Sequence, residues 1–224
     1  MDDSDAAPGT RIDIVSDAIC PWCYIGKRKL EQALPVLDAE GLRFTVRWNP
    51  FQLNPDMPRE GRDRTAYRIA KFGAERAATL DTNIVEAADA VGLRFHPELM
   101  TRTPNTLDAH RLIWLAGKND VQDAAMEAVF SAYFVEGRDI GDHGVLAECG
   151  ATAGLDISDV RAFLASDQIA AEMTAADRAA REAGVNGVPS FFLDGYGLFS
   201  GAQPAEQMAE ALRRGRGILQ QRAA

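Results

Sequence analysis

The stretch Ile14-Val15-Ser16-Asp17-Ala18-Ile19-Cys20-Pro21-Trp22-Cys23-Tyr24 decides how the rest of the chain is interpreted. It begins as a short apolar strand, passes through a brief turn and opens a helix at Cys20. Two cysteines three residues apart on a helix share one face. Pro21 suits the first helical turn, because its missing N–H would have had no partner there. The stretch therefore predicts a strand, a turn and a helix that carries two thiols at its start.

The position of Cys20 favours nucleophilic chemistry. At a helix start the backbone N–H groups are unpaired and the macrodipole is positive, so a thiolate is stabilised. We therefore expect Cys20 to attack a disulfide. Cys23, one turn further on and more shielded, is expected to resolve the resulting mixed disulfide.

Two other interpretations of the cysteine pair remain open. A zinc site needs four ligands, and the sequence adds only Cys149 and three histidines without paired spacing, which are His96, His110 and His143. A purely structural disulfide across so short a loop gains little chain entropy. A strand followed by CxxC and a helix favours redox chemistry over both, and we expect neither a metal nor a resident cofactor.

Composition limits the class of protein. The 224 residues carry a formal net charge of -9, which argues against nucleic acid as the main partner. No apolar run approaches the length of a membrane span. The first ten residues carry three Asp and no apolar segment, and we expect a disordered tail there without an export signal. With only three cysteines, an odd number, the chain is expected to be cytoplasmic.

Strand signals occur near both ends of the chain and not between them. We expect strands at residues 11–16, 42–48, 190–193 and 196–200, with Asp194-Gly195 as a hairpin turn between the last two. Helices are expected at residues 21–40 and 203–214. Pro35 should kink or split the first helix, and Lys27-Arg28-Lys29 should lie on its wet face.

The middle of the chain has helical periodicity throughout. Helices are expected at residues 65–73, 74–91, 106–116, 120–135, 142–153, 156–164 and 167–183. The economical arrangement is one α/β domain formed by both ends and interrupted by an all-helical insertion. The predicted boundaries are 11–61 and 184–216 for the two halves of the α/β domain, and 62–183 for the insertion.

This order, with CxxC at the first helix, resembles the thioredoxin fold, and a helical block between its halves is a feature of the DsbA-like family. Local strings over residues 11–214 are similar to the FrnE-like cytosolic branch of that family. These strings are Ser16-Asp17 before Cys20-Pro21-Trp22-Cys23-Tyr24-Ile25-Gly26, Trp48-Asn49-Pro50-Phe51, Leu53-Asn54-Pro55, Pro104-Asn105-Thr106, Ala109-His110-Arg111, Tyr133-Phe134, Gly187-Val188-Pro189-Ser190-Phe191-Phe192 and Ser200-Gly201-Ala202-Gln203.

The resemblance implies a role for Val188 and Pro189. A proline directly before a buried strand must occupy its first position, because it cannot donate to the ladder. In thioredoxin-like proteins the matching proline is cis and lies against the CxxC, so the resemblance implies a cis Val188–Pro189 bond. The backbone of Val188 would then be free to pair with an extended peptide.

One departure from the family concerns Trp22. Strongly oxidising periplasmic members carry a His between their cysteines, whereas Trp22 has no charge and only a donor N–H. We expect a less stabilised Cys20 thiolate and a less oxidising dithiol. The resemblance then implies a thiol-disulfide oxidoreductase that acts on disulfide- or thiol-containing proteins or small molecules.

Two further functions stay open. Kappa-class glutathione transferases and 2-hydroxychromene-2-carboxylate isomerases share the fold, and they use the thiol of glutathione. Here Gly201, Ala202 and Gln203 precede the last helix, whose amides could receive a glutathione carboxylate. A non-catalytic, holdase-like binding module is the third hypothesis, and a homodimer is also open.

A few other residues receive weaker predictions. Asn49, Asn105 and His110 are candidate substrate-binding residues, although a packing or capping role is also expected for them. Cys149 is expected to be a small buried hydrophobe. Trp48 and Phe51 are expected in the core.

Overall fold

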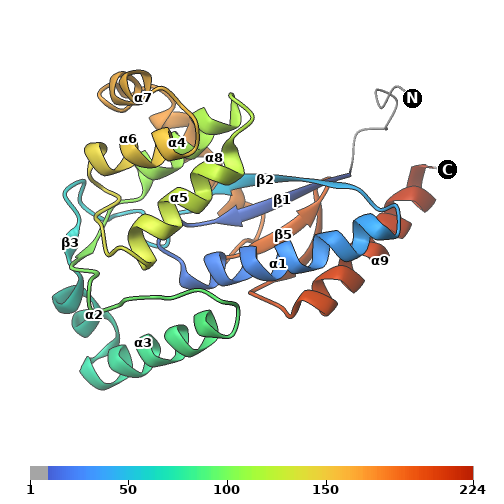
Figure 1. Ribbon diagram of the computed structural model, residues 1–224, viewed down its shortest axis with the longest axis horizontal. Coiled ribbons are helices and arrows are strands. Elements are labelled where there is room, and N and C mark those ends of the chain that lie inside the picture. The colour runs from blue at the N-terminus through green and yellow to red at the C-terminus, as the bar shows by residue number, and fades with distance from the viewer. Residues whose placement is uncertain (1–9, 224) are drawn as a thin grey trace.

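The chain folds around a four-stranded mixed sheet, seen in a computed structural model that describes residues 10–223 (Figure 1). The expected N-terminal tail lies outside those residues, apart from Thr10. The strands are β1 (Thr10–Ser16), β2 (Phe44–Pro50), β5 (Ser190–Leu193) and β6 (Tyr196–Ser200), in the order β2-β1-β5-β6. Strand β2 runs parallel to β1, whereas β5 is antiparallel to both β1 and β6. Both ends of the chain therefore build one sheet, as predicted.

Strand β1 is central because its residues suit burial on both sides. Ile12 and Ile14 are fully buried between β2 and β5. The β5–β6 hairpin turns at Asp194 and Gly195, with φ values of 46° and 84°, so the expected turn is confirmed. Two positive φ values are typical of a two-residue hairpin turn whose twist matches the strands.

Helix α1 (Pro21–Ala39) follows β1 and packs beside α9 (Ala205–Ala223) (Figure 1). The helix is not split at Pro35, because α1 continues through it, and the expected kink there stays a prediction. Pro35 is exposed, so water can satisfy the carbonyl that loses its helical N–H donor. Helix α9 also runs beyond the predicted end at residue 214. Gly215 does not stop it, and a Cβ there would lie 2.7 Å from Leu198, so this glycine allows close packing on β6.

Between the halves lie seven helices within the described residues. They are α2 (Arg64–Phe72), α3 (Ala74–Asp89), α4 (Leu107–Gly117), α5 (Gln122–Phe134), α6 (His143–Thr152), α7 (Ile157–Leu164) and α8 (Ala170–Glu182). Asp142 and Asp156 cap α6 and α7 with their side chains, as their positions in the sequence predicted. Helix α8 begins later than expected, after Ile169 in the left-handed region (φ 65°).

The middle of the chain also contains a short ribbon that the sequence did not predict. Strands β3 (Arg62–Asp63) and β4 (Arg102–Thr103) pair antiparallel. Two residues are too few to show a period. Within residues 10–223 we find no helix that is both long and apolar enough to cross a membrane. The domain boundaries at residues 61 and 183 stay a prediction.

Candidate active site

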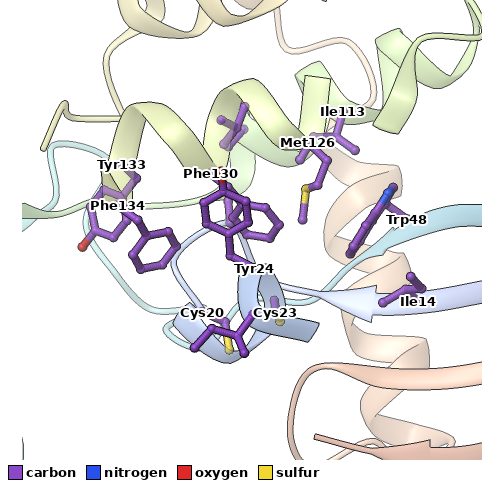
Figure 2. Packing of buried hydrophobic residues seen from close by; sticks show 14 of the residues in the cluster. Ile14, Cys20, Cys23, Tyr24, Trp48, Ile113, Met126, Phe130, Tyr133 and Phe134 are labelled. Carbon is purple, nitrogen blue, oxygen red and sulfur yellow. The ribbon is translucent and has the colours of Figure 1, made fainter. Parts of the chain in front are cut away.

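The two cysteines lie at the start of α1, directly after the turn that leaves β1. Cys20 is the N-cap residue, and its N–H donates to the carbonyl of Asp17 at 3.0 Å. Cys23 lies in the first turn, where its N–H donates to the carbonyl of Cys20 at 3.0 Å. Both are free thiols, and both are buried. Figure 2 shows them below the aromatic side chains that join α1 to α5.

The loop before β5 meets Cys20. The Sγ atom of Cys20 donates to the carbonyl oxygen of Val188 at 3.4 Å, across 168 residues of sequence. The Val188–Pro189 bond is cis, so the implied geometry is confirmed. Gly26 makes the approach possible, because a Cβ at this position would lie 3.2 Å from Cγ of Pro189.

The environment of Cys23 keeps its thiol protonated. Burial raises the pKa of Cys23 well above its usual value, and the hydrogen bond and charge of the neighbouring Cys20 raise it further. The Ser16 side chain and the Asp17 backbone act in the opposite direction. The two cysteines also differ in position, because Cys20 lines a pocket whose lining does not include Cys23.

A buried polar group behind Cys23 was missed by the sequence analysis. Asp17 is fully buried, and its Oδ2 accepts from the N–H of Leu53 at 2.6 Å. Its Oδ1 finds no hydrogen-bond partner among the described residues and lies 3.4 Å from Nε2 of His110. The Oγ of Ser16 is buried as well. The sequence signal for this group was the polar pair Ser16-Asp17, which lies between the apolar strand and the CxxC motif.

Several of the predicted site residues line one of two cavities. The first, which we call the thiol pocket, has a volume of about 360 Å³ and is lined by Cys20, Pro21, Trp22 and Val188 together with residues of α2, α3 and α5. The second measures about 330 Å³ and is lined by Ser16, Asn49 and His110, among others. The predicted site residues are therefore divided between two cavities. The substrate-binding roles of Asn49 and His110 stay predictions.

The remaining predicted residues lie elsewhere. Asn105 donates to the carbonyl of Met57 at 2.7 Å and accepts from the N–H of Leu107 at 2.9 Å, at the start of α4. In the 201–203 segment, the N–H of Gly201 donates to the Pro189 carbonyl at 2.7 Å.

The other amides of that segment offer a limited anion site. The N–H of Gln203 donates to the carbonyl of Gly201, and the carbonyl of Ala202 accepts from Lys29. Two of the three amides of residues 201–203 are therefore already paired, whereas the amides expected to receive a glutathione carboxylate are those at the start of α9. The role of this segment in glutathione binding stays a prediction.

Tyr24 ties the dithiol helix to the helical block. Its ring stacks on Phe130 of α5, with centroids 4.8 Å apart, as Figure 2 shows. Its hydroxyl donates to Oε1 of Glu127 at 2.6 Å. Burial, followed by the contact with Glu127, raises the pKa of Tyr24 above its usual value. The turn that carries the cysteines is therefore held from both the sheet and α5.

The expectation that Lys27 lies on the solvent-exposed face of α1 is wrong. Its side chain is buried and its ammonium lies 3.1 Å from carboxylates of both Asp123 and Glu127 and pairs with Glu31. Attraction to these carboxylates is needed to offset the desolvation of the ammonium. Trp48, Phe51 and Cys149 are buried, as predicted. Residues 10–223 bring together no group of three or more His, Cys, Asp or Glu that could hold a metal ion.

The chain matches the family described as DSBA-like thioredoxin domain over residues 11–213. The crystal structure of a probable DsbA oxidoreductase from Streptomyces coelicolor is 35% identical, with a TM-score of 0.82 over 93% of this chain and 90% of that one.

Two more distant structures share the fold. A 2-hydroxychromene-2-carboxylate isomerase is 20% identical, with a TM-score of 0.66 over 95% of this chain and 98% of that one. The cytosolic disulfide reductase DsbM from Pseudomonas aeruginosa, solved with glutathione, is 18% identical, with a TM-score of 0.60 over 95% and 98%. The family match and the first of these structures carry the assignment: the chain belongs to the DsbA-like thioredoxin domain family of oxidoreductases.

Proposed function

We propose that the chain is a thiol-disulfide oxidoreductase in which Cys20 attacks and Cys23 resolves. The observation that carries the proposal is the asymmetry of the pair. Cys20 starts α1, lines the thiol pocket and contacts the Val188 carbonyl, whereas Cys23 is fully buried behind it. A substrate sulfur that enters the thiol pocket would therefore meet Cys20 and not Cys23.

The reaction has two exchange steps. The Cys20 thiolate attacks one sulfur of a substrate disulfide, forms a mixed disulfide and expels the other sulfur as a thiolate, which takes up a proton. Cys23 then attacks the sulfur of Cys20 and releases the second substrate thiol. The substrate gains two electrons, and the protein is left with a Cys20–Cys23 disulfide. In the reverse direction the same steps oxidise a dithiol.

The pKa of Cys23 favours its action as the nucleophile of the second step. Beyond burial, the neighbouring Cys20 is what raises the pKa of Cys23. When Cys20 is consumed in a mixed disulfide, its hydrogen bond and its charge no longer act on Cys23. The thiol of Cys23 is then more easily deprotonated, at the moment when a second nucleophile is required.

The substrate and the location are proposed on weaker support. A small thiol such as glutathione is the proposed co-substrate, consistent with the glutathione complex of the DsbM structure. The fold shared with a cytosolic reductase is compatible with a cytoplasmic enzyme whose dithiol is mostly reduced at rest.

The decisive experiment is the reduction potential of the pair in glutathione buffers, measured with Cys149→Ala to silence the third thiol. A two-electron couple between about -120 and -270 mV is expected, the range of thioredoxin-fold oxidoreductases. Cys23→Ser should accumulate the mixed disulfide on Cys20, and Cys20→Ser should not react. If no Cys20–Cys23 disulfide forms, the proposal is wrong. Isomerase or transferase activity in the Cys23→Ser protein would then support the glutathione-dependent alternative.

A further inference from the structure

The residues that line the thiol pocket can recognise parts of a ligand other than its sulfur atom. Much of the pocket lining is apolar and aromatic, with the side chains of Trp22, Phe72, Leu80, Ile84 and Phe134. Helices α2 and α3 contribute residues to the pocket, and both lie away from the sheet, at the end of the molecule where α1 begins (Figure 1). A volume of about 360 Å³ falls within the range of small-molecule sites.

Three cations line the same pocket. Arg64, Arg68 and Lys71 follow one another at intervals of four and three residues on α2, so they share a face. No Asp or Glu is among the described residues that line the pocket. A positive wall in a chain of net charge -9 is therefore a local feature.

The cations are only partly neutralised. Arg64 and Arg68 share one carboxylate, that of Asp81, with Nη2–Oδ1 distances of 2.7 and 2.9 Å. The Nε of Arg68 is buried without a hydrogen-bond partner among the described residues. Within residues 10–223, Lys71 donates only to neutral oxygens, Oδ1 of Asn54 at 2.8 Å and the Tyr67 hydroxyl at 3.1 Å. Three positive charges thus face one negative charge.

We propose that the thiol pocket selects small disulfides and thiols that carry a carboxylate on an apolar body. The apolar body packs on the aromatic side chains that line the pocket, the carboxylate pairs with Lys71 and Arg68, and the sulfur reaches Cys20. This inference rests on the proposed function and adds a substrate class to it. A charge-assisted pair at the mouth of an apolar pocket orients the ligand as well as binding it.

The chemistry is the exchange already described. The Cys20 thiolate attacks the disulfide of the bound anion, one carboxylate-bearing thiolate leaves, and Cys23 releases the other. The protein disulfide that remains is reduced by two molecules of a low-molecular-mass thiol, which supply one electron each and leave as their own disulfide. The carboxylate takes no part in bond making, so its contribution is to binding and orientation.

The test compares two aryl disulfides that differ only in charge, bis(nitrobenzoate) disulfide and the matching bis(nitrobenzamide) disulfide. The released aryl thiolate is followed by absorbance in single turnovers of the reduced, full-length protein. Each rate constant is divided by that of free dithiothreitol, which removes intrinsic reactivity. Lys71→Gln and Arg68→Gln are compared with Arg76→Gln, which removes an exposed cation of α3 that does not line the pocket.

We expect the normal protein to prefer the carboxylate disulfide about tenfold after this correction, the effect of one charge-assisted pair. Lys71→Gln should remove most of that preference, Lys71→Arg should restore it, and Arg76→Gln should leave it unchanged. Added salt should also weaken it. Lys71 is exposed, so its variant tests the inference even if Arg68→Gln unfolds.

Two results separate the inference from the proposed function. If both disulfides react at Cys20 without a preference, or if Lys71→Gln keeps the preference, the anion selection is wrong while the dithiol chemistry stands. If neither disulfide reacts with the normal protein, the dithiol chemistry itself is wrong, and with it the inference.

Discussion

Replacing Gly26 by alanine tests how closely α1 packs on the loop that meets Cys20. A Cβ at this position would lie 3.2 Å from Cγ of Pro189 and 3.7 Å from Cβ of Ala202. Ordinary carbon contacts are about 3.5–4.0 Å, so the Pro189 ring must retreat by a few tenths of an ångström. The N–H of Gly201 binds the Pro189 carbonyl at 2.7 Å, which restrains that movement.

The magnitude follows from two opposing effects. Alanine in place of a helical glycine stabilises by about 1 kcal/mol, whereas overpacking a close contact costs about 1–3 kcal/mol. Gly26→Ala should therefore change the free energy of unfolding by between roughly zero and 2 kcal/mol of destabilisation. Gly217→Ala is the matched control, because it lies in α9 with no heavy atom within 4 Å of the new Cβ. It should stabilise by about 1 kcal/mol.

Urea denaturation measures both variants, and single-turnover disulfide exchange measures the effect on the site. We expect Gly26→Ala to slow exchange, because moving Pro189 also moves the Val188 carbonyl that contacts Sγ of Cys20 at 3.4 Å. Gly217→Ala should leave the exchange rate unchanged. Equal stabilisation by both variants, with unchanged exchange rates, would refute the reasoning that close packing at Gly26 places this loop.

Three further predictions concern other parts of the fold. Tyr24→Phe removes the hydroxyl that donates to Glu127 at 2.6 Å. The free energy of unfolding, measured by urea denaturation, should fall by about 1.5–3 kcal/mol, as expected for a hydrogen bond to a charged group. A fall of less than about 0.5 kcal/mol would show that water replaces the hydroxyl. Burial acts to raise the pKa of Asp108, but hydrogen bonds from His143 and Arg111 outweigh it and hold the pKa below its usual value of 3.8. Its stabilising contribution is therefore present above pH 3.8 and is lost as the pH falls through the lower folded-state value. Acid denaturation should show a shallower loss for Asp108→Asn than for the normal protein, and parallel curves would contradict this. Burial raises the pKa of Cys149 to about 11, so iodoacetamide at pH near 8 should alkylate Cys20 and spare Cys149 in the native protein, as read by peptide mass spectrometry.

Local signals in the sequence predicted much of the fold. The turn at Asp194-Gly195 and the caps at Asp142 and Asp156 are decided by backbone conformation and by hydrogen bonds within a few residues. Such features need no knowledge of distant segments. Alternating or continuous apolar residues and a hairpin turn signal likewise predicted the four strands of the sheet.

Long-range features were beyond such reasoning. Lys27 looked like a surface residue, because the carboxylates of Asp123 and Glu127 that surround it come from α5. The pairing of β3 with β4 joins residues about forty positions apart through two-residue strands. Nothing within one helix shows which neighbour will cover it.

The candidate site shows the same division. The sequence identified the cysteines and the Val188–Pro189 bond, because these form short motifs. It gave no role to the cations of α2, although their spacing on one face was visible, because their meaning depends on a pocket shared with α1 and α3. Asn49 and His110 line a second cavity, and the sequence could not show this because the residues that line it come from distant parts of the chain.

The contact between Cys20 and Val188 has a consequence for synthesis on the ribosome. The two residues are 168 positions apart, and translation at about 5–20 residues per second takes roughly ten to thirty seconds to cover that distance. During that interval the nascent chain carries a dithiol without the strand β5 and the loop that later enclose it. We expect the thiols to be most accessible to adventitious oxidants in this period, before the completed chain folds over them.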